Sequence, residues 1–132
     1  NWSKGRYGSN ASIITMRMAE IYLLAAEADV YLTGGANANK YINKVRERAN
    51  ASQYNGAVDI QYVLDERARE LAGESVRWFD LKRTGKLTED YLQQKNPDVG
   101  QYFRDNTHTV RPIPQSFTEI IENGVEYQNP NY

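Results

Sequence analysis

Residues 60–85 read IQYVLDERARELAGESVRWFDLKRTG, and they combine an apolar helical pattern with a high density of charge. The apolar side chains recur at the three- and four-residue intervals that bring them onto one side of a helix, namely Ile60, Val63, Leu64, Ala68 and Leu71. Ten charged residues lie among them: Asp65, Glu66, Arg67, Arg69, Glu70, Glu74, Arg77, Asp80, Lys82 and Arg83. The segment therefore predicts a charged helical scaffold, and its residues alone name no ligand.

Three glutamates of this segment are spaced four residues apart. Glu66, Glu70 and Glu74 should therefore lie along one side of a helix, and like charges at this spacing repel by roughly 0.2–0.5 kcal/mol per exposed pair. The helix is expected to begin near Asp59, whose carboxylate can cap the first turn. Cations from the same helix or from neighbouring helices should compensate the acidic row, and the candidates are Arg67, Arg69, Arg77, Arg17 and Arg46.

Two glycines divide the rest of the segment. Gly73 is expected to break or kink the first helix, and Gly85 to end a second, shorter helix over residues 75–83. Within that shorter helix, the apolar residues expected to point inward are Trp78, Phe79 and Leu81.

Residues 15–32 predict a helix that is apolar nearly all round, which indicates burial on several sides. Gly34 and Gly35 should stop it, and residues 36–49 predict a second amphipathic helix. Because only a few residues connect the two, we expect them to pack antiparallel as a helical hairpin.

Arg17, Glu20 and Glu27 share one stripe of the first predicted helix, although the helix is otherwise largely apolar. An isolated buried ion is very costly, so these charges should be paired. The favoured interpretation is an ion-pair network between helices, with a catalytic carboxylate as the minor alternative. We expect this structural network to contain Arg17, Glu27, Arg46, Glu66, Glu70, Arg77 and Asp80.

The whole pattern predicts an all-α fold of tetratricopeptide-like helical hairpins, with long irregular loops and an extended carboxyl-terminal tail. We expect a single domain over 1–132, with a lead-in loop (1–14), helical hairpins (15–85), and a loop, short helix and tail (86–132). The sequence NPDVG at 96–100 predicts a turn, and Ser116 can cap a short helix running to Glu122. The tetratricopeptide consensus positions are poorly met, so the repeat layout is a weak signal by itself.

Composition argues against several classes of protein. The net charge of −1 provides no basic excess to neutralise phosphates, so nucleic acid is not an expected partner. The lack of cysteine excludes disulfides and thiolate metal sites, and no apolar run approaches the ~18 residues of a membrane span. The single histidine, His108, lies in a polar loop and has no ligand partner at helical spacing, so neither a metal nor another cofactor is expected.

No catalytic motif stands out. The sequence contains no GxSxG elbow and no glycine-rich phosphate loop. Glycoside hydrolysis needs two carboxyl groups across a cleft, whereas Glu66, Glu70 and Glu74 share one helix side. Nearby arginines would also stabilise the ionised carboxylates, which does not suit a general acid. We therefore expect a protein that is not an enzyme, with chemistry by the carboxylate row as a minor alternative.

Four blocks of sequence resemble, in order, the carboxyl-terminal signature of the SusD/RagB family. RMAEIYLLAAEA at 17–28 is similar to the family's R.AE.YL..AEA helix, and INKVRERA at 42–49 to its IN.VR.RA segment. Residues 66–83 are similar to its ER..EL..E..RW.DL.R block, and PIP at 112–114 with QNPNY at 128–132 to its closing PIP and QNPGY. Asn131 stands where the family has glycine, a small departure because asparagine also tolerates positive φ.

This resemblance implies a lipoprotein on the external face of a bacterial outer membrane, which captures glycans or, in some members, peptides. Its expected partners are the oligosaccharide or peptide ligand and a SusC-like TonB-dependent transporter that the protein covers. Family members are several times longer, so the resemblance implies a carboxyl-terminal portion with the lipid anchor outside this chain. The matched motif residues look structural in the family, and none of them transfers as a ligand contact.

Any ligand contact within this chain is expected from aromatic residues in segments without helical periodicity: Trp2, Tyr7, Tyr91 and Tyr102. Aromatic rings stack on the C–H faces of sugars at small entropic cost. The alternative is that these rings pack against the rest of a longer protein or tie down loops, while Tyr22 and Trp78 belong to the core. A function of a different class also remains open, namely a stand-alone helical-repeat module that binds proteins.

Overall fold

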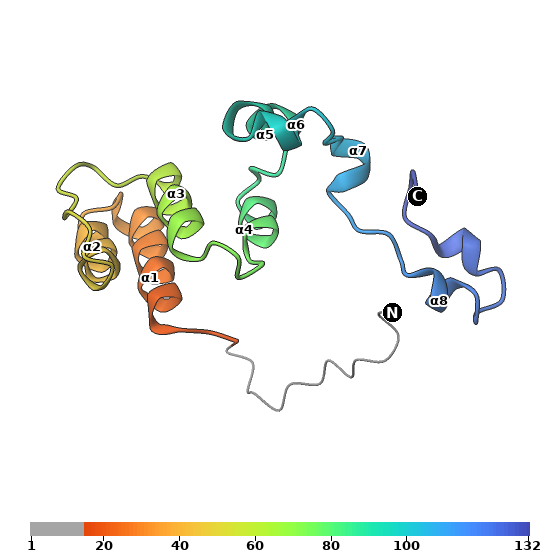
Figure 1. Ribbon diagram of the computed structural model, residues 1–132, viewed down its shortest axis with the longest axis horizontal. Coiled ribbons are helices and arrows are strands. Elements are labelled where there is room, and N and C mark those ends of the chain that lie inside the picture. Colours follow the sequence, from red (N-terminus) through yellow and green to blue (C-terminus); the bar gives the residue numbers. More distant parts are fainter. Residues whose placement is uncertain (1–14) are drawn as a thin grey trace, which may run out of the picture. The chain divides into compact units, whose positions relative to one another are not determined.

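The computed structural model describes residues 15–132, and within them every regular element is a helix (Figure 1). The prediction of an all-α fold is therefore confirmed. The chain divides into two compact units, Asn1–Ala72 and Gly73–Tyr132. The boundary falls at Gly73, the predicted helix break, where φ is 81°. A single domain over 1–132 stays a prediction.

Three helices make up the described part of the first unit: α1 (Met18–Thr33), α2 (Ala38–Arg48) and α3 (Ile60–Glu70). α1 packs against both of the others (Figure 1). Residues near the start of α1 and near the end of α2 line the same hollow, so these two helices run antiparallel as predicted. Each helix supplies fully buried apolar side chains, including Leu23 and Ala26, Ile42, and Val63 and Leu64.

The predicted glycines and an aspartate shape the hairpin turn. α1 is closed by Gly34, whose φ of 74° is left-handed; the N–H of Gly34 donates to the carbonyl of Val30, and the N–H of Gly35 donates to that of Asp29. The carboxylate of Asp29 accepts the N–H of Asn37 at 2.7 Å, so the last turn of α1 tethers the entry to α2. Desolvation raises the pKa of Asp29, but the hydrogen bonds from Asn37, Thr33 and Ala38 together outweigh it and hold that pKa below its ordinary value.

Gly35→Ala is expected to destabilise the first unit more than Gly34→Ala, although both glycines have left-handed φ. A Cβ at Gly35 would lie 2.3 Å from the carbonyl oxygen of Val58, whereas a Cβ at Gly34 meets nothing within 4 Å. The left-handed backbone costs about 1–2 kcal/mol in both variants, and the clash at Gly35 should add roughly 1–3 kcal/mol. Urea denaturation of the two variants measures the difference, and equal losses would show that the approach of Val58 is unimportant.

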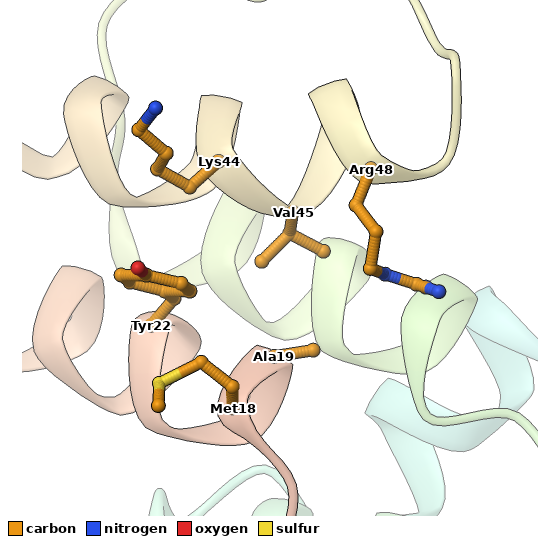
Figure 2. Close-up of a pocket in the computed structure, with 6 residues that line it drawn as sticks. All are labelled: Met18, Ala19, Tyr22, Lys44, Val45 and Arg48. Atoms are coloured by element: carbon orange, nitrogen blue, oxygen red, sulfur yellow. The ribbon is translucent and has the colours of Figure 1, made fainter.

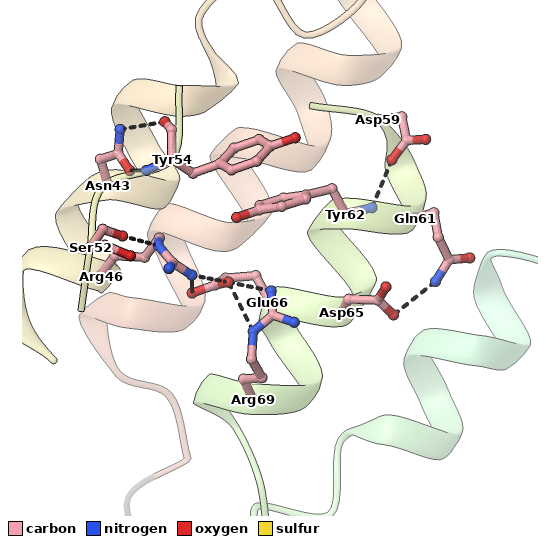
Figure 3. A network of polar contacts seen from close by, with 10 residues as sticks. All are labelled: Asn43, Arg46, Ser52, Tyr54, Asp59, Gln61, Tyr62, Asp65, Glu66 and Arg69. Atoms are coloured by element: carbon pink, nitrogen blue, oxygen red, sulfur yellow. Dashed lines mark hydrogen bonds and ion pairs between the residues drawn. The ribbon is translucent and has the colours of Figure 1, made fainter. Parts of the chain in front are cut away.

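Side chains fix the connector between α2 and α3. Asn43 and the backbone of Tyr54 exchange hydrogen bonds of 2.8 and 2.9 Å, and the Tyr54 and Tyr62 rings stack with centroids 3.9 Å apart (Figure 3). Asp59 accepts the N–H of Tyr62 at 2.7 Å, so its predicted capping role is confirmed. These contacts set the position from which α3 presents its charged residues.

The second unit consists of short helices around a small apolar core. In chain order they are α4 (Arg77–Arg83), α5 (Glu89–Lys95), α6 (Pro97–Gly100), α7 (Asp105–His108), α8 (Gln115–Thr118) and the 3₁₀ helix η2 (Gly124–Tyr127). Leu81, Leu87, Tyr91 and Phe103 form the core, and Trp78 and Leu92 pack against it.

Three of these helices, α5, α6 and α7, lie where the sequence pattern predicts irregular chain. Thr88 caps α5 by accepting the N–H of Tyr91 at 3.2 Å, and Pro97 opens α6 inside the predicted NPDVG turn. The prediction of a plain turn at 96–100 was therefore wrong in detail. Such short helices complete too few turns to show an apolar period, which is why the pattern does not reveal them.

The inward orientation predicted for Phe79 and the helix predicted from Ser116 to Glu122 were also wrong. Phe79 is 55% exposed, because the core lies on the side of α4 that carries Leu81. α8 begins one residue before Ser116, directly after Pro114, whose fixed φ already suits entry into a helix, and it ends at Thr118.

The carboxyl-terminal tail is folded back on the PIP segment. The side-chain amide of Gln128 accepts the N–H of Ile113 at 2.7 Å and donates to the carbonyl of Ile113 at 3.0 Å. Asn129 donates to the carbonyl of Arg111 at 2.6 Å. Asn131 has a φ of 70°, the left-handed conformation that its place in the QNPNY motif predicts. The tail is therefore less extended than the sequence predicts. The side-chain amides of Gln128 and Asn129 attach it to residues 111–113.

Candidate functional site

Two arginines hold the carboxylate of Glu66 on α3. Arg46 of α2 donates through Nη1 to both oxygens, at 2.9 and 3.2 Å, and Arg69 donates to Oε2 at 2.5 Å (Figure 3). Arg46 also donates through Nε to the carbonyl of Ser52 at 2.7 Å. Because the Glu66 side chain is only 6% exposed, these donors replace the water that it has lost. Beside them, desolvation raises the pKa of Tyr62 above its ordinary value.

One turn further along α3, Glu70 connects the ends of three helices. Arg17, directly before α1, pairs with the Glu70 carboxylate and also donates to its backbone carbonyl at 2.6 Å. Arg48, the last residue of α2, donates to the same carboxylate at 2.7 Å. The Glu70 carboxylate is buried, whereas the Arg48 side chain is exposed. Arg17, Arg48 and Glu70 therefore join the three helices at one end of their packing.

The structure thus brings together Arg17 with Glu70 and Arg46 with Glu66, four members of the predicted network. Arg48 was not included in the prediction, although it takes part; Arg69 was named only as a candidate cation for the acidic row, and it pairs with Glu66. For Arg69 the signal was in the sequence, because it follows Glu66 at the i,i+3 spacing of helical pairs. For Arg48 no spacing rule applies, because residues two apart on a helix, such as Arg46 and Arg48, do not share one side.

The first unit contains two further buried charges. Arg67 is buried on α3 and faces Glu20 of α1, with Nη2 3.6 Å from Oε1. Glu27, a predicted network member, is buried within α1. Arg67 and Glu27 therefore lie inside the helix packing, where they cannot reach a ligand without breaking it.

In the second unit the predicted residues have local contacts. Asp80 is buried and pairs with Arg83 of the same helix at 2.9 Å. Arg77 directs Nη2 toward the hydroxyl of Tyr91 at 3.5 Å. Tyr91, a predicted ligand contact, is thus a core residue with 9% of its area exposed.

The other predicted ligand contacts differ in their surroundings. Tyr102 is 72% exposed and follows α6, so its ring is available to a ligand. Trp2 and Tyr7 lie outside the described residues. Direct contact with a ligand stays a prediction for all of these aromatic residues.

A hollow of about 280 Å³ lies between α1 and α2 (Figure 2). Met18, Ala19 and Tyr22 line it from α1, opposite Lys44, Val45 and Arg48 of α2. Its two cations pair elsewhere, Lys44 with Glu47 and Arg48 with Glu70. The hollow is therefore an apolar surface between packed helices, without the converging polar groups that usually orient a small ligand.

The sequence prediction also overlooked an aromatic and cationic group around α4, here called the α4 cluster: Trp78, Phe79, Lys82 and Arg111. The two rings meet edge to face at 5.2 Å. Lys82 Nζ lies 4.8 Å from the centre of the Trp78 ring, and the Arg111 guanidinium carbon lies 4.9 Å from the same ring and 5.6 Å from Phe79. The i,i+4 spacing of Trp78 and Lys82 indicated that these two side chains could meet, but no spacing indicated Arg111.

Over residues 15–132 there is no group of three or more acidic or histidine side chains placed to hold a metal ion. None of the helices in the same range has the length and apolar composition needed to cross a membrane.

The sequence model of the SusD family matches residues 1–132. The chain belongs to the SusD family. The resemblance read from the four motif blocks is thereby confirmed, and the SusD-family motifs coincide with the contacts described above. The ER..EL block contains Glu66, Arg67 and Glu70, and all three lie in the helix packing as ion-pair partners.

Several curated relatives share this region. The chain is 45% identical over 123 residues to the SusD-like protein P25 of Formosa agariphila, an alignment that covers 83% of the chain and 22% of that relative. It is 40% identical over 130 residues to the starch-binding protein SusD of Bacteroides thetaiotaomicron, covering 93% of the chain and 22% of the relative. It is 32% identical over 139 residues to the SusD-like protein P2 of Formosa agariphila, covering 94% of the chain and 26% of the relative.

The chain thus spans about a quarter or less of the length of these relatives. No solved structure gives a significant match.

Proposed function

We propose that this chain is the helical scaffold of a non-catalytic, nutrient-binding component of an outer-membrane uptake system. The ligand is an oligosaccharide, with a peptide as the alternative ligand class, and the partner is a SusC-like TonB-dependent transporter. The observation that carries the proposal is the family match over 1–132 together with 40% identity to a protein named as starch-binding. A lipid anchor in another part of the longer parent protein would hold it on the external face of the membrane.

The geometry of the charged residues supports binding over catalysis. Glu66 and Glu70 each accept from two arginines of the same chain, so their oxygens are occupied by the scaffold. A general acid or base must reach the proton that it transfers, within hydrogen-bond distance of the substrate. Carboxylates that connect three packed helices are placed instead to hold those helices in register.

A binding screen on the full-length parent protein tests this function. We expect at least one class of oligosaccharide on a glycan array to bind, and we expect the protein to co-purify with a TonB-dependent transporter when its own operon is expressed. Binding to a peptide library alone would shift the proposal to the peptide class of ligand. Capture of soluble proteins without binding of any saccharide or peptide would contradict it and would support the stand-alone helical-repeat module.

A further inference from the structure

The α4 cluster places two positive charges beside the half-buried ring of Trp78. Trp78 packs against the core of the second unit and donates through its indole N–H to the carbonyl of His108 at 3.4 Å, which fixes the ring. Lys82 and Arg111 both lie within 5 Å of that ring, close enough for cation–π attraction. The cations are thus held at one place on the surface, although they come from separate segments.

These two cations have no carboxylate partner in the described part of the chain, in contrast to Arg46 and Arg48. Lys82 donates to the carbonyl of Thr109 at 2.7 Å, and within residues 15–132 the guanidinium of Arg111 contacts the Trp78 and Phe79 rings. A guanidinium carries five N–H donors in a fork that matches a carboxylate or a sulfate. The donors of Arg111 therefore remain available to an anionic group from outside.

The positive charge of the cluster is local. Residues 73–132 contain nine Asp and Glu residues against seven Lys and Arg residues, so the second unit is acidic as a whole. An acidic ligand would be repelled by most of this unit and attracted at the α4 cluster, which favours one docking position over diffuse attraction.

Phe79 adds an apolar surface next to the cations. Its ring is 55% exposed and lies 5.6 Å from the guanidinium carbon of Arg111. Sugar rings combine an apolar C–H face with polar groups at the rim, and aromatic side chains bind that face. An exposed phenyl ring beside a fixed guanidinium therefore matches a sugar that carries an acidic group at its edge.

From this geometry we propose that the α4 cluster is a subsite for an acidic sugar residue. The anion, a uronate carboxylate or a sulfate ester, accepts from Arg111 and is further neutralised by Lys82, while the sugar ring stacks on Phe79. This inference rests on the proposed function and deepens it, because it specifies an acidic oligosaccharide among the possible ligands. Holding the cations in advance lowers the entropic cost of ordering them when the ligand binds.

Calorimetric titration of the full-length parent protein tests the subsite. The probes are tri-galacturonate for the carboxylate, a sulfated galactan hexasaccharide for the sulfate, maltoheptaose as a neutral saccharide, and hexaglutamate as an acidic peptide. Arg111→Gln should weaken binding of one acidic saccharide by roughly tenfold or more, since hydrogen bonds to charged groups contribute about 1.5–3 kcal/mol. The acidic saccharide with the larger loss identifies the anion.

The control variant is Lys40→Gln, which removes the same charge from an exposed site on α2 where the structure shows a backbone contact but no side-chain contact. It should leave every affinity unchanged, and Phe79→Leu should weaken the acidic saccharide but not hexaglutamate. The inference is overturned if Arg111→Gln and Lys40→Gln have equal effects, or if hexaglutamate binds as well as the acidic saccharides. Binding of maltoheptaose alone would reject the subsite and leave the proposed function standing, whereas binding of neither a saccharide nor a peptide would reject both.

Discussion

Glu66→Ala should lower the free energy of unfolding of the first unit by about 3–5 kcal/mol, the usual cost of breaking a buried ion pair by removing one partner. The Glu66 side chain is 6% exposed and that of Arg46 is 17% exposed, so the guanidinium would stay largely buried without its counter-ion. Arg69, being more than half exposed, can turn to water and should contribute little to the loss. Urea denaturation followed by circular dichroism measures the change.

Glu47→Ala is the matched control, since Glu47 pairs with Lys44 on the solvent side of α2 and both side chains are exposed. That variant should lose no more than about 1 kcal/mol, the upper range for surface pairs. In the double variant Arg46→Met/Glu66→Leu both buried charges are gone, and most of the stability should return. Equal losses for Glu66→Ala and Glu47→Ala would show that the motif charges do not hold the helices together.

Leu23→Ala should destabilise the same unit by about 2.7–5 kcal/mol, through lost burial and the cavity left behind. Leu23 has no exposed area and lies in α1, the helix that packs against both α2 and α3. The same substitution at Leu32, in the last turn of α1 and 83% exposed, removes almost no buried surface. Thermal unfolding should therefore give a clearly lower melting temperature for Leu23→Ala than for Leu32→Ala. Similar melting temperatures would argue against α1 as the centre of the packing.

The first unit could be predicted from sequence in most respects because its determinants are local. Asp59 caps α3, and Gly34 ends α1 in the left-handed conformation, as short-range signals indicate. That Glu66 and Arg46 belong to an ion-pair network between helices also followed from the cost of burying charge. The participation of Arg48 could not be deduced with the same certainty, because a long exposed side chain can reach a buried carboxylate from several positions.

The second unit was predicted less well because its contacts join distant segments. α6 is a single turn and leaves no period in the sequence. Arg111 reaches Trp78 and Phe79 only after the chain has passed through α5, α6 and α7, so no spacing rule connects them. The exposure of Phe79 likewise depends on which side of α4 the core occupies, a tertiary choice that two adjacent aromatic residues do not specify.

The central proposal is that this SusD-family chain belongs to a protein that binds an oligosaccharide, or a peptide as the alternative ligand class, and does not convert it. The most direct measurement is calorimetric titration of the full-length parent protein with the oligosaccharide that its glycan array selects, followed by chromatography of the recovered ligand. The account predicts saturable binding and recovery of the intact oligosaccharide after prolonged incubation. Cleavage of the oligosaccharide, or the absence of binding to any saccharide or peptide, would contradict it.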